Sequence, residues 1–231
     1  MRGVTLSGVA VCAGAVASGS AMGAVDVVGG AGWSGLDTVW GGKVRNMTHT
    51  NGDWEMALGQ TPGSFALHGH TTWAASGSDN AFRLSYSNLT GDITLEWNGS
   101  VLSWNDADRA ESLGIQLLAR GKSGGDATYT VGDLAFNGEA IDLGGAAAFA
   151  SAGTTIDHGV ASYLWVGGDE FSTLDSWTLS GTLNASWSGS TPSRDLSRVE
   201  FIASNNRLTI PTPAGLAAMG LTAFMVTKRR R

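Results

Sequence analysis

Two histidines one residue apart are the first candidates for chemistry in this sequence. In the stretch GSFALHGH, His68 and His70 flank Gly69. Residues i and i+2 of a β-strand point to the same side, so both imidazoles could approach one metal ion, which His49 and His158 could also join. No glutamate follows the pair at the spacing that would complete a His–His–Glu site. The sequence therefore favours polar surface histidines over a metal centre.

Oxygen ligands gather in a second stretch, NDADRAE. It contains Asp106, Asp108 and Glu111, and calcium prefers carboxylate and carbonyl oxygens of this kind. The glycine-bearing order of an EF-hand loop is absent. Ca²⁺ at these three residues is the only cofactor that the sequence indicates, and a solvated turn is the alternative.

The nine tryptophans raise the possibility of sugar binding, because flat indole rings stack on sugar rings. Three of them, Trp97, Trp177 and Trp187, fall on the apolar faces of predicted strands, where core packing is favoured. The other candidates stand in less regular stretches and are the potential ligand-binding residues for an extracellular polysaccharide: Trp33, Trp40, Trp54 and Trp73.

Motifs of enzyme active sites are missing. The sequence has no nucleophile elbow, no P-loop and no zinc-protease helix. A pair of glycosidase carboxylates cannot be recognised from sequence, because their separation is spatial. The sequence therefore predicts no catalytic residue and no enzyme.

Strict alternation of apolar and polar residues dominates the middle of the chain. The strands that this pattern predicts must position any functional site. The stretch SWTLSGTLNASW, from Ser176 to Trp187, carries its apolar side chains on one face and its hydroxyls and amide on the other. Period two over this length predicts a half-buried antiparallel strand. AFRLSY and DITLEWNGSVLSW repeat the pattern, and Asn98-Gly99 predicts a hairpin turn.

Roughly ten short stretches of this kind, separated by glycine-rich turns, predict an all-β fold. We expect an antiparallel β-sandwich with jelly-roll-like topology over residues 24–206. In SLGIQLLAR, the residues Leu113, Ile115 and Leu117 are expected to share the buried face. The weakest segment is LGGAAAFASAG, residues 143–153, where a loop or a helical turn is expected.

Charge is distributed unevenly along the chain. All 20 acidic residues lie between Asp26 and Glu200, whereas the 14 basic residues include Arg2 and four at the C-terminus. The nine remaining basic residues give the middle a net charge of −11. Such a surface repels phosphate backbones, so nucleic acid is excluded as a partner.

The N-terminus has the anatomy of a secretory signal peptide. Arg2 precedes an apolar stretch from Gly3 to Ala17. The small residues Ala21 and Gly23 then stand at positions minus three and minus one of a cleavage site. This order predicts a signal helix over residues 1–23, with cleavage after Gly23 or the next residue, and the secretion machinery as a partner. Cys12 is the only cysteine, so the chain has no intrachain disulfide.

The C-terminus has three parts. Residues 207–213 form a linker that ends in Pro211, Thr212 and Pro213, and fourteen uncharged residues follow, from Ala214 to Thr227. As a helix they span about 21 Å, short of the roughly 30 Å hydrocarbon core, but flanking residues can extend the span. A membrane helix over 214–231 is expected, held on the cytoplasmic side by four basic residues: Lys228, Arg229, Arg230 and Arg231.

This tail resembles the PEP-CTERM sorting signal of Gram-negative bacteria, with Thr212 in place of the usual glutamate. The resemblance implies recognition and cutting by an exosortase, a membrane cysteine protease. An ordinary tail anchor is the alternative.

The middle resembles the choice-of-anchor domains, of the class labelled W. The stretches AFRLSYSNLTGDITLEWNGS, LGIQLLARG and LDSWTLSGTLNASWSGSTPS, within about 65–203, carry the resemblance. It implies an exported β-sandwich of no established enzymatic activity. We therefore expect a structural or interaction protein of the cell envelope, cell surface or extracellular matrix of a Gram-negative-type bacterium. A lectin-like module is the second expectation, and a secreted glycan-active hydrolase is the third.

The N-terminal pattern gives a first testable prediction. Protein recovered from its native host should begin at residue 24 or 25, because signal peptidase cuts after small residues. N-terminal sequencing measures this directly. An intact Met1 on a soluble cytoplasmic product would contradict the prediction.

Overall fold

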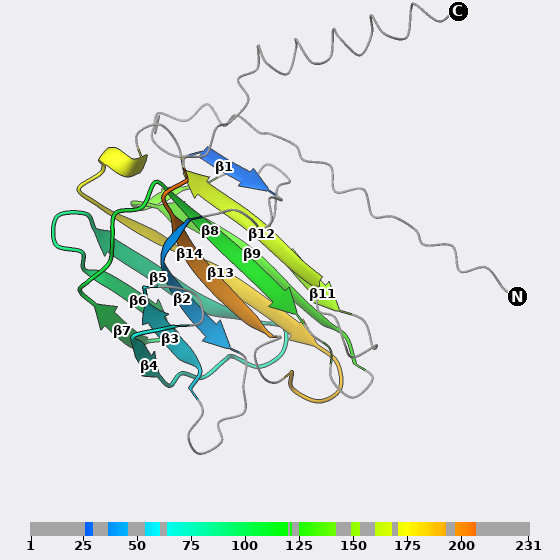
Figure 1. The fold of residues 1–231 in the computed structure, drawn as a ribbon. Coiled ribbons are helices and arrows are strands. Elements are labelled where there is room, and N and C mark those ends of the chain that lie inside the picture. Colours follow the sequence, from blue (N-terminus) through cyan, green and yellow to red (C-terminus); the bar gives the residue numbers. More distant parts are fainter. Residues whose placement is uncertain are drawn as a thin grey trace, which may run out of the picture.

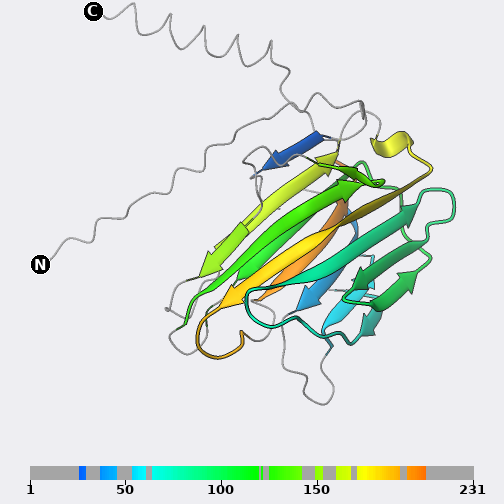
Figure 2. The same cartoon turned by 180° about the vertical axis from the view of Figure 1, so that it is seen from behind.

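The computed structural model describes ten stretches of the chain: 26–29, 37–45, 54–60, 64–119, 121, 125–141, 149–152, 160–167, 171–192 and 197–206. The predicted signal peptide, the sorting motif and the predicted membrane helix lie outside these residues. The described part is all-β, with two antiparallel sheets in a sandwich-like arrangement and one 3₁₀ turn, η1 (Phe171–Thr173). Figure 1 views the molecule from the side of the first sheet, and Figure 2 from the side of the second.

Seven antiparallel strands make up the first sheet. In spatial order they are β1 (Asp26–Gly29), β12 (Val160–Gly167), β8 (Ser112–Ala119), β14 (Arg198–Ser204), β2 (Thr38–Arg45), β3 (Met56–Gly59) and β4 (Leu67–Gly69).

The second sheet also has seven strands. In spatial order they are β10 (Glu139–Ala140), β9 (Ala127–Phe136), β13 (Ser176–Trp187), β5 (Ser78–Ser87), β6 (Ile93–Trp97) and β7 (Ser100–Trp104), with β11 (Phe149–Ala152) beside β9.

The alternating segments form strands as predicted. β13 has the bounds expected from the pattern, and its residues Trp177, Leu179 and Leu183 are buried. Asn98 and Gly99 both have positive φ angles, 46° and 83°, which is the backbone of a type I′ hairpin turn between β6 and β7. The predicted β-sandwich is thereby confirmed at the level of two packed antiparallel sheets.

Two segments differ from their expectations. Every residue of β8 is buried, including Ser112, Gln116 and Leu118 of the outward phase and not only Leu113, Ile115 and Leu117, so both faces of this strand are covered. The segment expected to be a loop or a helical turn contains the strand β11, which pairs with β9 along Thr130–Ala127. Pairing with a neighbour thus overrides the weak local pattern of small residues.

Aromatic rings from both sheets meet in the core. Trp40 of β2 lies 5.4 Å from Tyr86 of β5 and 6.2 Å from Trp177 of β13, measured between ring centroids. Phe201 of β14 lies 5.2 Å from Phe82 of β5. Aromatic pairs of this geometry contribute about 0.5–1.5 kcal/mol each beyond the area that they bury, so they fasten the two sheets to each other.

The residues just before β2 and just after β14 are hydrogen-bonded to each other. The backbone N–H of Asp37 donates to Oδ1 of Asn206 at 2.7 Å, and that of Asn205 donates to the carbonyl of Asp37 at 3.0 Å. Ser112 and Ser204 also donate hydroxyl hydrogen bonds to Asn206, at 2.8 Å each. We call Asp37, Ser112, Ser204 and Asn206 the terminal clasp, which joins the start of β2, the start of β8 and the end of β14.

Gly181 allows a stability test of the core. A Cβ at this position of β13 would lie 2.8 Å from Cζ of Phe82 and 3.1 Å from the carbonyl oxygen of Gly132. Gly181→Ala should lower the free energy of unfolding by about 1–3 kcal/mol, because the Phe82 ring must move within a packed core. Urea unfolding measures the change. The control Ser186→Ala, on an exposed position of the same strand, should be nearly neutral, and equal effects of both variants would contradict the packing.

Candidate functional site

The two paired histidines have separate partners. His70 Nδ1 lies 2.7 Å from Oε2 of Glu55, whose side chain is buried, while the ring of His68 stacks on Trp54 with 4.7 Å between centroids. Both histidines are exposed. Within the part of the chain that the structure describes, no group of three or more His, Cys, Asp or Glu residues could hold a metal ion.

The three candidate calcium ligands lie in the loop between β7 and β8. Asp106 and Asp108 are exposed, and Glu111 is half-buried. The loop is held through its main chain: the Tyr86 hydroxyl donates to the carbonyl of Asp108 at 2.8 Å, and the N–H of Glu111 donates to the carbonyl of Ser204 at 2.8 Å. These contacts position the backbone and leave the Asp106 and Asp108 carboxylates toward solvent.

The candidate sugar-binding tryptophans divide by burial. Trp40 is fully buried in the aromatic core, so the expectation that it could contact a ligand is wrong. It alternates inward with Gly42 and Val44, but the adjacent glycines hide this pattern in the sequence. Trp73 is half-buried against Trp97, and Trp33 lies outside the described residues.

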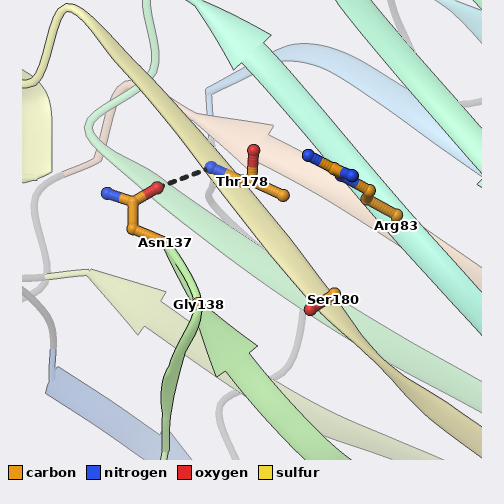
Figure 3. Close-up of a pocket in the computed structure, with 5 residues that line it drawn as sticks. All are labelled: Arg83, Asn137, Gly138, Thr178 and Ser180. Atoms are coloured by element: carbon orange, nitrogen blue, oxygen red, sulfur yellow. Dashed lines mark hydrogen bonds between the residues drawn. The ribbon is translucent and has the colours of Figure 1, made fainter.

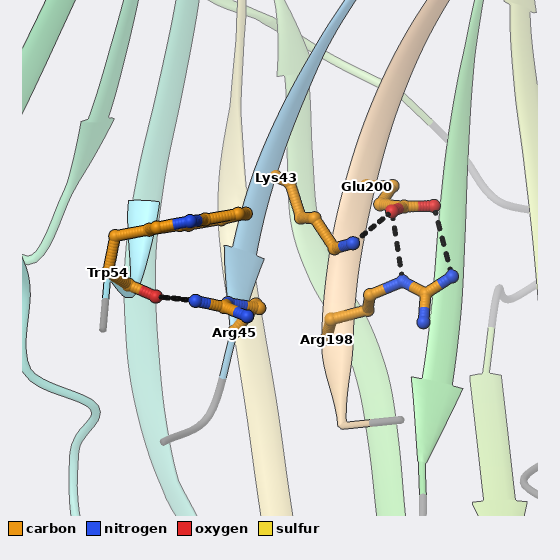
Figure 4. A network of polar contacts seen from close by, with 5 residues as sticks. All are labelled: Lys43, Arg45, Trp54, Arg198 and Glu200. Carbon is orange, nitrogen blue, oxygen red and sulfur yellow. Dashed lines mark hydrogen bonds and ion pairs between the residues drawn. The ribbon is translucent and has the colours of Figure 1, made fainter. Parts of the chain in front are cut away.

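Trp54 belongs to a charged cluster on the outer face of the first sheet. The guanidinium of Arg45 lies 3.6 Å from the centre of the Trp54 ring and also donates to the Trp54 carbonyl (Figure 4). Next to this pair, Glu200 bridges Lys43 at 3.1 Å and Arg198 at 2.9 Å. Since Trp54 already stacks on Arg45 and His68, its ring is part of the packing between β2, β3 and β4 and offers little free surface to a sugar.

A polar depression on the outer face of the second sheet is a candidate binding site. It has a volume of about 520 Å³ and is open to solvent. Figure 3 shows its five lining residues: Arg83, Asn137, Gly138, Thr178 and Ser180. We refer to this site as the polar depression.

Three strands build the polar depression. Thr178 and Ser180 are outward residues of β13, and Arg83 is an outward residue of the neighbouring β5, directly opposite Ser180. Asn137 and Gly138 form the turn after β9, with φ angles of 50° and 85°. The Asn137 Oδ1 accepts from the backbone N–H of Thr178 at 2.8 Å, which fixes the turn against β13.

A row of polar side chains crosses the same face at right angles to the strands. The strand registers place four members opposite one another on β13, β5, β6 and β7, and the fifth lies in the turn after β9 beside Thr178; the members are Thr178, Ser85, Thr94, Ser103 and Asn137. The hydroxyl oxygens of Ser85 and Thr178 are 3.4 Å apart, and those of Thr94 and Ser103 are 3.1 Å apart. We call these five residues the hydroxyl row.

A second depression continues the first along this row. It has a volume of about 280 Å³, shares Asn137 and Thr178 with the polar depression, and is also lined by Ser85 and Thr94. Sequence patterns alone do not indicate this surface. The hydroxyls of β13 were visible in its alternation, but their neighbours on β5, β6 and β7 are brought together only by strand register.

Comparison with known proteins gives no assignment: no protein-family model matches the chain, and no curated protein matches it. Among the residues that the structure describes, no helix is long and apolar enough to span a membrane.

Tyr86, beneath the loop of the candidate calcium ligands, gives a prediction on pH dependence. Burial raises the pKa of Tyr86 to about 12. The phenol is therefore neutral in the folded protein at pH values where the unfolded chain, with a pKa of about 10, has already lost this proton. The stability from the neutral phenol is complete below pH 10 and is lost as the pH rises toward 12.

Urea unfolding of the wild type and of Tyr86→Phe between pH 9 and about pH 11 tests this. The wild type should lose more stability with rising pH than the variant, by at most about 1.4 kcal/mol per pH unit. The variant serves as the matched control, because other groups also titrate in this range. Parallel curves for the two proteins would contradict the shifted pKa.

Proposed function

We propose that this protein is an exported, envelope-sorted surface or extracellular-matrix protein of a Gram-negative-type bacterium, structural or interacting in kind and without catalytic activity. The observation that carries the proposal is the terminal clasp. It ties the end of β14, the last described strand, to the start of β2 and the start of β8 by hydrogen bonds. A strand fixed in this way supports the idea that the tail beyond it serves as a sorting signal and not as part of the sandwich.

The proposed route uses both ends of the chain. The secretion machinery reads residues 1–23, and an exosortase reads the motif Pro211, Thr212 and Pro213. Residues 214–231 hold the protein in the membrane, with the basic residues from Lys228 to Arg231 on the cytoplasmic side, since translocating four cations is costly. In this proposal the sandwich is a jelly-roll variant and a choice-of-anchor domain of the W class.

A second candidate function is glycan binding. The polar depression and the hydroxyl row support it, because they gather hydroxyl, amide and guanidinium groups on one open face. Of the four candidate tryptophans, Trp40 is buried and cannot contact a glycan. The ring of Trp54 already stacks on Arg45 and His68, which leaves little of it for a sugar.

Truncation tests the proposed sorting. Deleting residues 211–231 should release a folded protein with an unchanged melting temperature, because β14, which ends at Ser204, is already paired on both sides with β8 and β2. Fractionation of the native host and thermal unfolding measure the two properties. As a matched control, deletion of residues 197–231 removes β14 and should abolish folding. Unfolding or aggregation of the shorter truncation would show that the tail belongs to the core.

A full-length variant and mass spectrometry distinguish a cleaved sorting signal from a plain tail anchor. Replacing Lys228, Arg229, Arg230 and Arg231 with Ser should weaken retention and leave the melting temperature unchanged. A mature C-terminus near Pro211–Pro213 means processing by a sorting protease, and an intact Arg231 means a plain tail anchor.

A further inference from the structure

The polar depression and the second depression form one continuous, shallow surface. Their volumes are about 520 and 280 Å³, and they are joined through Asn137 and Thr178. A compact small-molecule ligand is normally held in a cleft that covers most of its surface. An open and elongated surface instead suits a polymer that lies across the strands and is contacted from one side.

The groups that line this surface match sugar hydroxyls. Each serine or threonine hydroxyl can donate one hydrogen bond and accept two, as a sugar hydroxyl does. Arg83 adds up to five donors, and its exposed side chain has no hydrogen-bond or ion-pair partner among the described residues. The Asn137 Oδ1 is occupied by the backbone of Thr178, so its Nδ2 is the group that remains for a ligand.

The surface is held in place before a ligand arrives. Thr178, Ser85 and Thr94 stand on three hydrogen-bonded strands, and the β-branched threonines have few rotamers to lose. Their hydroxyls are already paired at 3.4 Å, between Thr178 and Ser85, and at 3.1 Å, between Thr94 and Ser103. Pre-organisation of this kind reduces the entropy lost on binding.

Charge decides which sugars fit. Among the described residues of β5, β6, β7, β9 and β13, the outer face carries Asp79, Glu96 and Asp133 against the one cation Arg83, and Asp92 lines the second depression. The middle of the chain has a net charge of −11. A polyanion such as a polyuronate would be repelled. Tyr86 and Trp177 also line the second depression, but both side chains are buried in the core. None of the described residues that alternate to the outer face on β5, β6, β7, β9 and β13 is aromatic, so recognition depends on hydrogen bonds.

We propose that the polar depression and the hydroxyl row bind an uncharged, hydroxyl-rich polysaccharide through Arg83, Asn137, Thr178 and Ser180. The proposal rests on the glycan-binding candidate above and names its face and its ligand class. Each sugar is held weakly, and affinity accumulates along the polymer as successive sugars meet successive strands.

The experiment is affinity electrophoresis of the full chain, kept in solution by a detergent without a sugar headgroup. The native gels contain dextran, galactomannan or xylan as neutral probes, and alginate as the polyuronate probe. At least one neutral polysaccharide should retard the protein, and alginate should not. Thr178→Val, which keeps the shape and removes the hydroxyl, and Arg83→Gln should each weaken binding about five-fold, as expected for one lost hydrogen bond.

The matched control is Thr128→Val, the same chemical change on an exposed threonine of β9 that does not line either depression. It should bind like the wild type, and all variants should keep the wild-type melting temperature. Three results would each overturn the proposal. The first is that no neutral probe retards the protein, and the second is that alginate retards it more strongly than the neutral probes do. The third is that Thr178→Val and Arg83→Gln still bind while Trp73→Ala does not. Envelope sorting is tested separately by the tail deletion, so either idea can fail without the other.

Discussion

The two last strands of the described chain lie in the middle of the two sheets, and the rest of the structure depends on their insertion. β13 separates β9 from β5, and β14 separates β8 from β2. Without them each sheet would divide into two halves made from distant parts of the sequence. Pairings of such high sequence separation cost loop-closure entropy before they return any stability, so the sandwich is completed only when residues near 200 are in place.

This constraint explains why the core is rich in aromatic side chains. With a single cysteine, the chain cannot tie its sheets together by an internal disulfide. Instead, Trp177 of the inserted strand β13 touches Trp40, Tyr86 and Phe136, which belong to β2, β5 and β9. One large side chain thus joins the three strands that β13 must organise. The same demand buries Trp40, Trp97 and Trp177, so their rings cannot stack on a sugar.

Strand bounds and turns could be predicted from the sequence, but the order of the strands within each sheet could not. The bounds of β13, the inward phase of Phe82 and Leu84, and the turn at Asn98-Gly99 follow from patterns within a few residues. The burial of Trp40 and of both faces of β8 depends on contacts with distant parts of the chain, and sequence periodicity does not contain that information. The hydroxyl row shows the same limit, because its members come from four strands and one turn that only the register aligns.

The terminal clasp has a mechanical consequence. β14 leads toward the C-terminal tail and is paired along its length with β8 on one side and β2 on the other, both antiparallel to it. If the tail is held at an envelope, tension on it pulls β14 along its own axis rather than sideways from an edge. All of its ladder hydrogen bonds then carry the load together, and the bonds of Asn206 with Asp37 and Ser112 receive that load first. A domain tethered in this way resists shear, whereas one tethered through an edge strand would unzip one hydrogen bond at a time.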